Sequence, residues 1–306
     1  MTTEAKTVII IPRTIPKICI VLGTRPEIIK MSPIIRLLEK ESADYFTLHT
    51  GQHYSYNMDK IFFEQLQLPI PRYNLNVGSG SHAQETGKML MGIEGILNDE
   101  KPSVILVEGD TNSVLAGALS ASKMHIKVGH VEAGLRSRDM SMPEEINRIL
   151  ADHMSDYLFA PTSLSRDNLL KEGIDEQKIF VTGNTVVDAL YQHLKLRKGD
   201  VKDELQLSDY FLVTLHRQEN VDNPERLRRI LTGLTSISKK YGRSIVWPIH
   251  PRSRKRLNEN GIALDPGFRL MEPIDYLTFL GLESQADLIL TDSGGVQEEA
   301  CILGVP

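Results

Sequence analysis

Three carboxylates follow apolar runs in the first half of the chain, at positions from which acids can transfer protons. Asp110 ends the segment "EGD", Glu132 lies in "HVEAG", and Glu144 lies in "MPEE". An acid at the end of a strand, facing a cleft, can act as a general base once burial raises its pKa. Asp110 also has a structural alternative, because an aspartate at this point can cap the helix that follows.

The two glutamates of this set have structural alternatives as well. Glu132 can form an ion pair with Arg136, which follows in the same motif. Glu144 can close a capping box with Ser141 or pair with Arg148 on the same helical face. The residue types alone therefore leave a catalytic and a structural role open for each acid.

A basic residue stands at an unusual position in "GTRPEIIK", which follows the apolar run "KICIVL". Thr24 and Glu27 have the spacing of a capping box, and Pro26 suits a first helical turn. A helix start carries partial positive charge on its unpaired N–H groups, so a cation such as Arg25 is out of place there. A phosphate that accepts from these N–H groups and from the guanidinium would explain Arg25; an ordinary surface arginine is the alternative.

A glycine turn in "TDSGGVQEEA", near the end of the chain, has the character of a second anion site. Ser293, Gly294 and Gly295 end an apolar run and begin a helix, and glycine lets backbone N–H groups approach a diphosphate closely. Glu298, one helical turn further on, can accept hydrogen bonds from the hydroxyls of a ribose. The alternative is that Glu298 and Glu299 only favour the positive end of the helix.

A histidine ends the first apolar run of the second half, in "LHRQEN". His216 can transfer a proton near neutral pH, or it can serve only as a hydrogen-bond donor. The run "HPRSRKR" lacks interleaved aromatic residues and the chain has a formal net charge of −5, so neither nucleic acid nor a membrane is a predicted partner. The phosphate fingerprints G-x-G-x-x-G and G-x-x-x-x-G-K-[ST] are missing at the expected places, which removes the main argument for NAD or ATP.

The elements that must hold these residues alternate between short apolar runs and helical segments. The first half contains "KICIVLG", "SVILVEGD", "IKVGHVEAG", "YLFAP" and "KIFVTGN", and the second half repeats the pattern with "FLVTLHRQEN", "SIVWPIHPRS", "FRLMEPIDY" and "DLILTDSGG". Continuous apolar strands that alternate with helices predict parallel sheets covered on both faces. We therefore expect an α/β protein of two Rossmann-like, doubly wound domains facing a central cleft, where open sheets bind ligands.

The limits of the two domains follow from composition. Residues 1–16 form a leader whose apolar run is interrupted by prolines before it could serve as a signal peptide or membrane span. Residues 17–190 are the predicted first domain, which carries the acids, and residues 191–306 the predicted nucleotide-binding domain, incomplete at its C-terminus because another strand is expected there. Cys19 and Cys301 are too few for a disulfide or metal framework, which favours a reducing, cytoplasmic location.

Eight motifs in this order resemble those of the non-hydrolysing UDP-N-acetylglucosamine 2-epimerases. They are "GTRPE", "TGQH", "EGDT", "HVEAGLRS", "PEEINR", "TGNTVVDAL", "HRQEN" and "TDSGGVQEEA", and the similarity extends from Lys17 to Pro306. The resemblance implies the GT-B architecture, with two Rossmann-like domains and the active site between them. It also implies a homodimer that interconverts UDP-N-acetylglucosamine and UDP-N-acetylmannosamine without NAD or a metal.

The resemblance implies roles on the nucleotide side of the site. Arg25 and the Ser293–Gly295 turn would hold the diphosphate, with His216 near it. Glu298 would bind the ribose, and Phe279 in "DYLTFL" would contact uracil.

Further roles concern the sugar. Asp110, Glu132 and Glu144 are similar to the catalytic acids of the family, and the sequence leaves open which acid serves which face of C2. Lys30 and Arg148 match polar positions near the sugar and phosphates.

The second motif of the resemblance concerns regulation. Gln52 and His53, in "TGQH", match the position where bacterial members bind a second, activating substrate molecule.

The implied reaction is elimination of UDP to 2-acetamidoglucal, followed by re-addition of UDP. Three other functions stay open at this point: a GT-B glycosyltransferase, an epimerase that hydrolyses its product, and a nucleotide-sugar-binding regulator without turnover.

Overall fold

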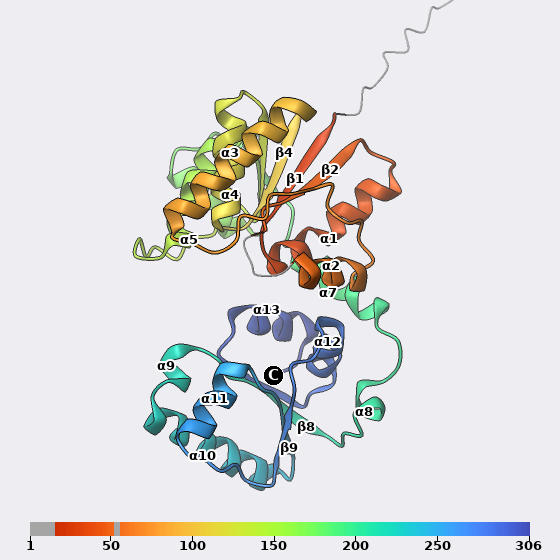
Figure 1. The fold of residues 1–306 in the computed structure, drawn as a ribbon, viewed down its shortest axis with the longest axis vertical. Coiled ribbons are helices and arrows are strands. Elements are labelled where there is room, and N and C mark those ends of the chain that lie inside the picture. Colours follow the sequence, from red (N-terminus) through yellow and green to blue (C-terminus); the bar gives the residue numbers. More distant parts are fainter. Residues whose placement is uncertain (1–15, 52–55) are drawn as a thin grey trace, which may run out of the picture. The chain divides into compact units, whose positions relative to one another are not determined.

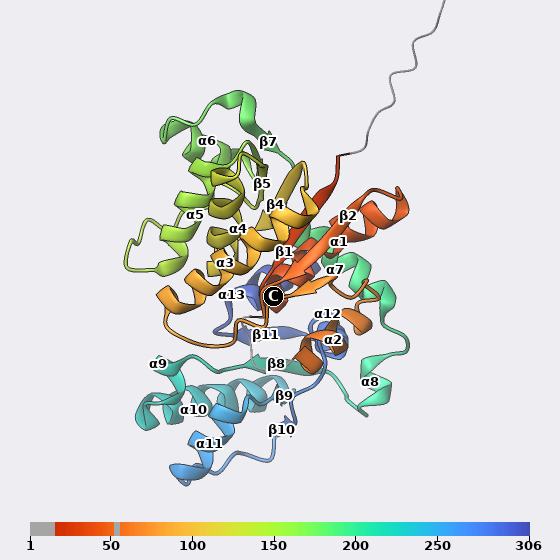
Figure 2. The ribbon, with the colours of Figure 1, turned by 45° about the horizontal axis from the view of Figure 1, so that its top comes forward.

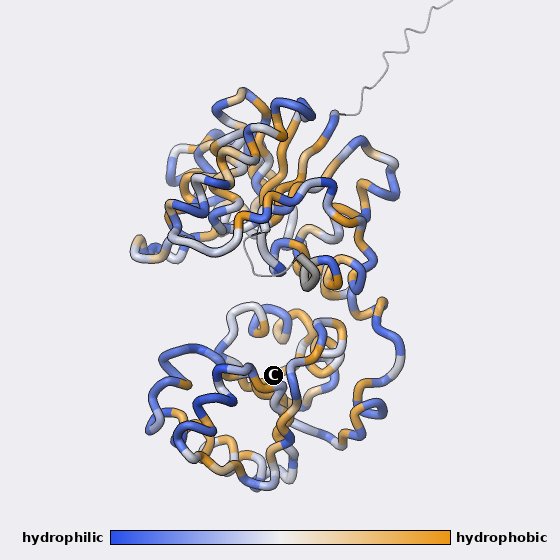
Figure 3. Tube along the Cα trace, viewed as in Figure 1, coloured by the Kyte–Doolittle hydropathy of each residue, from blue (hydrophilic) through white to orange (hydrophobic). Residues whose placement is uncertain are grey.

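The computed structural model describes residues 16–51 and 56–306, and the chain passes from one compact unit to a second between Thr185 and Val186 (Figure 1). Each unit contains one sheet, and every strand pair in both sheets is parallel. The predicted fold class, an α/β protein with two parallel sheets, is therefore confirmed. Figure 3 shows the most hydrophobic segments on the strands inside the first unit.

The first unit contains a seven-stranded sheet with the order β3-β2-β1-β4-β5-β6-β7. The interior strand β1 pairs with both β2 and β4, so the direction of winding reverses there, and open α/β sheets bind ligands at such a reversal. The two-residue strand β3 is too short for the sequence pattern to predict. The strands are β1 (Ile18–Leu22), β2 (Tyr45–His49), β3 (Tyr73–Asn74), β4 (Val104–Glu108), β5 (Lys127–Val131), β6 (Tyr157–Ala160) and β7 (Ile179–Val181).

Helices connect these strands, and because crossovers between parallel strands are right-handed as a rule, the reversal at β1 places helices on both faces of the sheet. Figures 1 and 2 show α3, α4 and α5 side by side on one face, where α4 packs between its two neighbours. The helices are α1 (Arg25–Lys40), α2 (Tyr56–Gln65), α3 (His82–Glu100), α4 (Asn112–Lys123), α5 (Pro143–Met154) and α6 (Ser163–Lys171), followed by a 3₁₀ turn at Glu176–Lys178.

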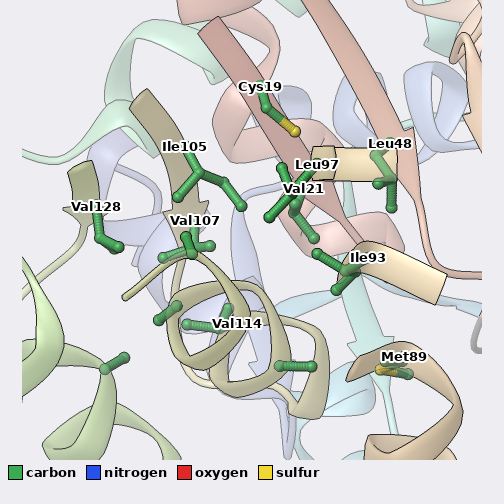
Figure 4. Packing of buried hydrophobic residues seen from close by; sticks show 14 of the residues in the cluster. Cys19, Val21, Leu48, Met89, Ile93, Leu97, Ile105, Val107, Val114 and Val128 are labelled. Carbon is green, nitrogen blue, oxygen red and sulfur yellow. The ribbon is translucent and has the colours of Figure 1, made fainter. Parts of the chain in front are cut away.

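A hydrophobic core joins the sheet to α3 and α4 (Figure 4). Strand side chains such as Val21, Ile105 and Val107 pack against Ile93 of α3 and Val114 of α4, and all five are buried. Burying one side chain of this size stabilises the fold by about 1.5–3 kcal/mol. This core fixes β1, β4 and β5 relative to one another, and the loops that leave their carboxyl ends carry the candidate acids.

The second unit contains a four-stranded sheet with the order β10-β9-β8-β11. Its strands are β8 (Tyr210–Thr214), β9 (Ser244–Pro248), β10 (Phe268–Met271) and β11 (Leu288–Thr291). Its helices are α7 (Thr185–Leu196), which begins at the boundary, α8 (Val201–Glu204), α9 (Gln218–Val221), α10 (Pro224–Tyr241), α11 (Pro251–Glu259), α12 (Tyr276–Gln285) and α13 (Gly294–Leu303).

Alternate residues of β8 enter two different cores. Phe211 and Val213 pack with Leu227 and Leu231 of α10, whereas Tyr210 and Leu212 belong to the core that includes α12 and α13. Successive side chains of a strand point to opposite faces of the sheet, so β8 is covered by core residues on both faces.

The boundary between the two units lies at the start of α7, whereas the sequence analysis predicted it within this helix, between residues 190 and 191. The helix packs on the second unit: the Tyr191 hydroxyl donates to the Ile302 carbonyl at 3.3 Å, and the buried ring of His193 lies edge-on to Tyr276. Among the helices of the described residues, none combines the length and apolar character needed to cross a membrane.

A close backbone contact near β5 gives a first prediction. Gly134 has φ +81°, and a Cβ there would lie 2.3 Å from the Ser165 carbonyl oxygen, whereas Gly173 has φ +83° with open space around a Cβ among the described atoms. We expect Gly173→Ala to lower the free energy of unfolding by about 1–2 kcal/mol through backbone strain alone. Gly134→Ala should cost at least about 2 kcal/mol more, because the backbone must also move.

Urea unfolding of both variants measures this difference. Equal losses for the two variants would contradict the steric argument.

Candidate functional site

Glu27 connects two of the loops that leave the carboxyl end of the first sheet. Thr24 is the N-cap of α1, and its backbone N–H donates to Glu27 Oε2 at 3.1 Å, which is the reciprocal half of the predicted capping box. The Gly23 N–H also donates to this carboxylate, and the Thr111 hydroxyl donates to its other oxygen. The β1–α1 loop is thereby tied to the β4–α4 loop.

The environment of Glu27 favours its neutral form. Burial of the side chain raises the pKa of Glu27 to about 7, against the opposing effect of the hydrogen bonds from Thr111, Gly23 and Thr24. A protonated Glu27 keeps the same partners, because the Thr111 hydroxyl can accept a hydrogen bond as well as donate one. Sequence analysis assigned Glu27 only a capping role and gave no sign of its contact with Thr111.

A lysine on α1 holds two acids of neighbouring strands. Lys30 Nζ lies 2.6 Å from Glu132 Oε2 and 3.6 Å from Glu108 Oε1. Burial raises the pKa of Glu108, with Lys30 acting against this shift and Glu132 adding to it. One cation thus serves two carboxylates, and Lys30 fixes the position of the Glu132 carboxylate at the end of β5.

The structural alternative for Glu132 is wrong, because Arg136 has other partners. The Arg136 guanidinium lies 2.7 Å from Asp152 Oδ2 and donates to both oxygens of Glu172 at 2.7 Å. Glu132 instead occupies the left-handed region with φ +69°, which costs a non-glycine residue about 1–3 kcal/mol. This backbone turn sets the direction in which the Glu132 side chain leaves the end of β5, toward Lys30.

Asp110 pairs with an arginine of α5. Arg148 donates to Asp110 Oδ2 through one nitrogen and to Glu145 Oε2 at 2.9 Å through another. The Asn147 side chain donates to the Asp110 carbonyl at 2.9 Å. The prediction that Asp110 could cap the following helix is wrong, because Thr111 is the N-cap of α4.

The adjacent acids Glu144 and Glu145 lie in different environments. Glu144 is exposed, and neither structural alternative for it holds: the N-cap of α5 is Met142 rather than Ser141, and Arg148 pairs with Glu145. Glu145 is buried and accepts from the backbone N–H groups of residues 137 and 138 at 2.9 and 2.8 Å. Burial works to raise the pKa of Glu145, and these hydrogen bonds override it and lower the pKa.

Sequence analysis missed Glu145. The available signal was its place three residues before Arg148, on the inward side of α5.

Arg25 is exposed at the first turn of α1, and its guanidinium carbon lies 5.8 Å from the centre of the Phe62 ring on α2. The stacking orients the cation, as the anion-binding prediction requires, without testing that prediction. Gln52 and His53 lie outside the described residues.

The chain beside Arg25 runs through a very narrow space. A Cβ at Gly23 would lie 1.9 Å from Ser113 Oγ and 2.8 Å from Thr50 Oγ1. These two hydroxyls are hydrogen-bonded to each other at 2.8 Å, so the end of β1 passes directly over the bond that joins the β2 end to α4.

In the second unit, Asp292 anchors the loop that carries His216. Its carboxylate accepts from the Arg217 backbone N–H at 2.9 Å and from the Asn220 side chain at 3.0 Å, and it pairs with His216 Nδ1 at 2.8 Å. Burial acts to raise the pKa of Asp292, and the donors of Asn220, Arg217 and His216 override it. Sequence analysis did not single out Asp292, although it immediately precedes the predicted glycine turn.

The glycine turn has the form predicted for it. Ser293 is the N-cap of α13, and its backbone N–H donates to Thr291 Oγ1 at 2.9 Å. Gly294 and Gly295 are exposed, and a Cβ on either would have no atom of the described chain within 4 Å, so the first turn of α13 is open to a ligand.

Three side chains stand near this turn. Glu298 is exposed, whereas Glu299 is half-buried, and the Tyr276 hydroxyl donates to it at 3.4 Å. Phe279 packs at the margin of the core beneath α12 and α13. In the first unit the structure therefore pairs Lys30 with Glu132 and Arg148 with Asp110. In the second unit it places His216 beside Asp292, which precedes the Ser293 turn.

The fold and these side chains define a class of protein. The first sheet carries paired acids and cations at its carboxyl end, and the second carries an open glycine turn at a helix start, an arrangement typical of α/β enzymes that bind phosphorylated ligands. In the described part of the chain, no group of three His, Cys, Asp or Glu side chains has a metal-binding arrangement.

The comparisons with known proteins give the family. The model of the UDP-N-acetylglucosamine 2-epimerase family matches residues 36–306. A UDP-N-acetylglucosamine 2-epimerase from Methanocaldococcus jannaschii is 59% identical over 300 residues, which cover 95% of this chain and 82% of that protein. The chain belongs to the UDP-N-acetylglucosamine 2-epimerase family and is an enzyme of the isomerase class.

A solved structure and a more distant relative extend the comparison. The crystal structure of the Methanocaldococcus jannaschii enzyme in complex with UDP-GlcNAc and UDP superimposes with a TM-score of 0.82 at 59% identity, over 95% of this chain and 82% of that one. A UDP-2,3-diacetamido-2,3-dideoxy-D-glucuronate 2-epimerase from Pseudomonas aeruginosa is 44% identical, over 95% of this chain and 82% of that protein. The predicted family and the GT-B fold are confirmed.

The raised pKa of Glu27 predicts a specific pH dependence of stability. The folded pKa of about 7 lies above the ordinary value of 4.5. The folded state therefore binds this proton more tightly, and the stabilisation is complete below about pH 4.5 and lost as the pH rises through about 7. Between about pH 5 and about pH 8 the wild type should lose about 2.5 kcal/mol more than Glu27→Gln, which cannot ionise.

Urea unfolding across this pH range measures the difference. Glu64→Gln, an exposed position on α2, is the control and should follow the wild type. Parallel curves for the wild type and Glu27→Gln would show that Glu27 stays ionised when buried.

Proposed function

We propose that this enzyme reversibly epimerises UDP-N-acetylglucosamine at C2 to UDP-N-acetylmannosamine. The observation that carries the proposal is the pairing of Glu132 with Lys30 and of Asp110 with Arg148 at the carboxyl end of the first sheet. Each acid is held in place by a cation from another element, and a general base must be positioned in this way to reach the proton that it takes. Membership of the family supports the choice of UDP-N-acetylglucosamine as substrate.

The reaction needs the departure of UDP, because the hydrogen on C2 is not next to a carbonyl group. As the C1–O bond breaks, its electron pair leaves with the UDP oxygen, and positive charge grows at C1. A carboxylate then takes the C2 proton, and the electrons of the C2–H bond form the C1=C2 double bond of 2-acetamidoglucal. Return of a proton to the opposite face of C2, with re-addition of the UDP oxygen to C1, gives the epimer.

The second unit supplies groups suited to the leaving group. The proposal places the diphosphate on the exposed N–H groups at the Ser293–Gly295 turn, where the helix start favours negative charge. His216, which Asp292 holds through Nδ1, would donate to a phosphate oxygen, and uracil would contact Phe279. Arg25 of the first unit would add a second cation for the departing UDP.

The first unit supplies the groups that handle protons. Asp110, Glu132 and Glu144 are the proposed acids, and Lys30 and Arg148 the proposed contacts to the sugar and phosphates. In the structure these two cations neutralise the acids. A bound substrate that draws Lys30 or Arg148 toward its phosphates would free the neighbouring carboxylate oxygen to accept a proton.

A second candidate substrate comes from the Pseudomonas aeruginosa relative, whose name specifies a diacetamido glucuronate sugar. UDP-N-acetylglucosamine is favoured because relatives of that name reach 59% identity. Homodimer formation, a cytoplasmic location and an activator site at Gln52 and His53 stay predictions.

Incubation with UDP-N-acetylglucosamine in D₂O tests the reaction directly. We expect NMR to show deuterium at C2 of a sugar that is still linked to UDP, in both epimers, because the proton that returns comes from an acid in exchange with solvent. Free N-acetylmannosamine would instead identify a hydrolysing epimerase, and turnover only with a sugar acceptor would identify a glycosyltransferase.

Substitution of the acids should separate catalysis from binding. Asp110→Asn or Glu132→Gln should lower the exchange rate at least about a hundredfold, the effect expected for loss of a general base. UDP affinity should stay within about tenfold, or about 1.4 kcal/mol. Glu94→Gln, an exposed acid on α3, is the matched control. Binding of UDP by the wild type without any exchange would indicate a regulator.

Glu298 and Glu299 compete for the ribose role. The sequence favours Glu298, whereas the structure favours Glu299, because its half-buried carboxylate is already oriented by Tyr276 and loses less freedom on binding. We expect Glu299→Gln to weaken UDP binding about tenfold and Glu298→Gln to weaken it about twofold or less, measured by calorimetry. The opposite order would restore the sequence prediction.

A further inference from the structure

A buried histidine joins the ends of the two strands that precede Asp110 and Glu132. His130, the fourth residue of β5, is fully buried, with Nδ1 2.6 Å from Asp152 Oδ1 and Nε2 2.8 Å from the Gly109 carbonyl oxygen. A carbonyl oxygen can only accept a hydrogen bond, and so can an ionised carboxylate. Both ring nitrogens must therefore donate, which makes the ring an imidazolium.

Asp152 of α5 is placed to hold this charge. Its second oxygen accepts from the Gly134 N–H at 3.1 Å and lies 2.7 Å from Arg136, so the carboxylate has a donor on each side. Burial by itself lowers the pKa of His130, and the Asp152 carboxylate overrides this effect and raises it. Glu132 acts in the same direction as Asp152.

Both backbone polar groups of Gly109 are hydrogen-bonded to β5. The Gly109 N–H donates to the Val131 carbonyl at 3.2 Å, and the Gly109 carbonyl accepts from His130 Nε2. Gly109 immediately precedes Asp110, and Val131 immediately precedes Glu132. Strands β4 and β5 are already paired by backbone hydrogen bonds up to Glu108 and Val131. The histidine therefore contributes little to strand pairing, and its contact holds the residues that follow the two strands.

We propose that His130 is a positioning residue for the reaction: held as an imidazolium by Asp152, it fixes Gly109 and thereby sets Asp110 in relation to Glu132. This inference rests on the proposed function, because those two acids are its proposed proton-transfer groups. A misplacement of about 1 Å in such a group can cost about a hundredfold in rate. The histidine itself touches no substrate in this proposal.

A pair of substitutions tests the hydrogen-bond pattern. In His130→Gln the amide nitrogen can donate to Gly109, but the amide oxygen then faces the Asp152 carboxylate, and two acceptors repel each other. We expect kcat for C2 exchange to fall about tenfold to a hundredfold, with KM for UDP-N-acetylglucosamine changed about threefold or less.

Adding Asp152→Asn should rescue this variant. The asparagine amide can donate to the glutamine oxygen, so the Gly109 contact forms again without any charge. The double variant should recover to within about fivefold of the wild-type kcat. Asp152→Asn also removes the ion pair with Arg136, so it lowers stability, and a gain in kcat from it cannot be a gain in stability.

Asp156→Asn is the matched control. Asp156 accepts from the Val128 N–H at 3.0 Å and pairs with Lys127 at 2.6 Å, so it supports the other end of β5. It should lower the unfolding temperature without changing kcat. The inference would be overturned if His130→Gln had the same kcat as the wild type, or if the double variant were no faster than His130→Gln.

Hydrogen–deuterium exchange gives a readout that does not depend on turnover. The peptide covering residues 107–113 should exchange faster in His130→Gln than in the wild type and recover its protection in the double variant. Unchanged exchange in His130→Gln would overturn the inference. A wild-type protein without C2 exchange would overturn the proposed function, and this peptide would still decide the role of His130.

Discussion

The first unit depends on the pairing of partly or fully buried carboxylates with a small set of cations. Lys30 lies between Glu132 and Glu108, and Arg148 lies between Asp110 and Glu145. Removing one partner of a buried ion pair costs about 3–5 kcal/mol, so each cation supports the fold as well as the site. The same ion pairs hold the acids and cations that the proposed reaction uses, and this links the stability of the unit to its chemistry.

Most of the fold could be predicted from the sequence, because both sheets are parallel and covered on both faces. Strands such as Ile18–Leu22 and Tyr210–Thr214 are buried on both sides, and this gives the continuous apolar runs that single them out. The two-residue strand Tyr73–Asn74 carries no such signal. The assignment of α7 to the second unit also escaped prediction, because it rests on contacts such as Tyr191 to Ile302 between residues far apart in the chain.

The loops that carry the candidate site could be predicted from the sequence, whereas the ion-pair partners of its residues could not. The loops after β1, β4, β5, β8 and β11 are marked in the sequence by polar residues that follow apolar runs. The partners of those residues come from other elements, so Glu132 was assigned a local partner in Arg136 and instead meets Lys30 of α1. Asp152, Asp292 and Glu145 were missed for the same reason: their importance comes from donors on distant segments rather than from their own motif.

The crossing at Gly23 restricts which residue this chain can hold at that position. The main chain at residue 23 lies against the hydroxyl pair of Thr50 and Ser113, with no room for even a methyl group. The path of the loop at this point is therefore limited by steric exclusion. Even an alanine at residue 23 would have to push these two hydroxyls aside, so the loop that carries Arg25 keeps its path only while residue 23 is glycine.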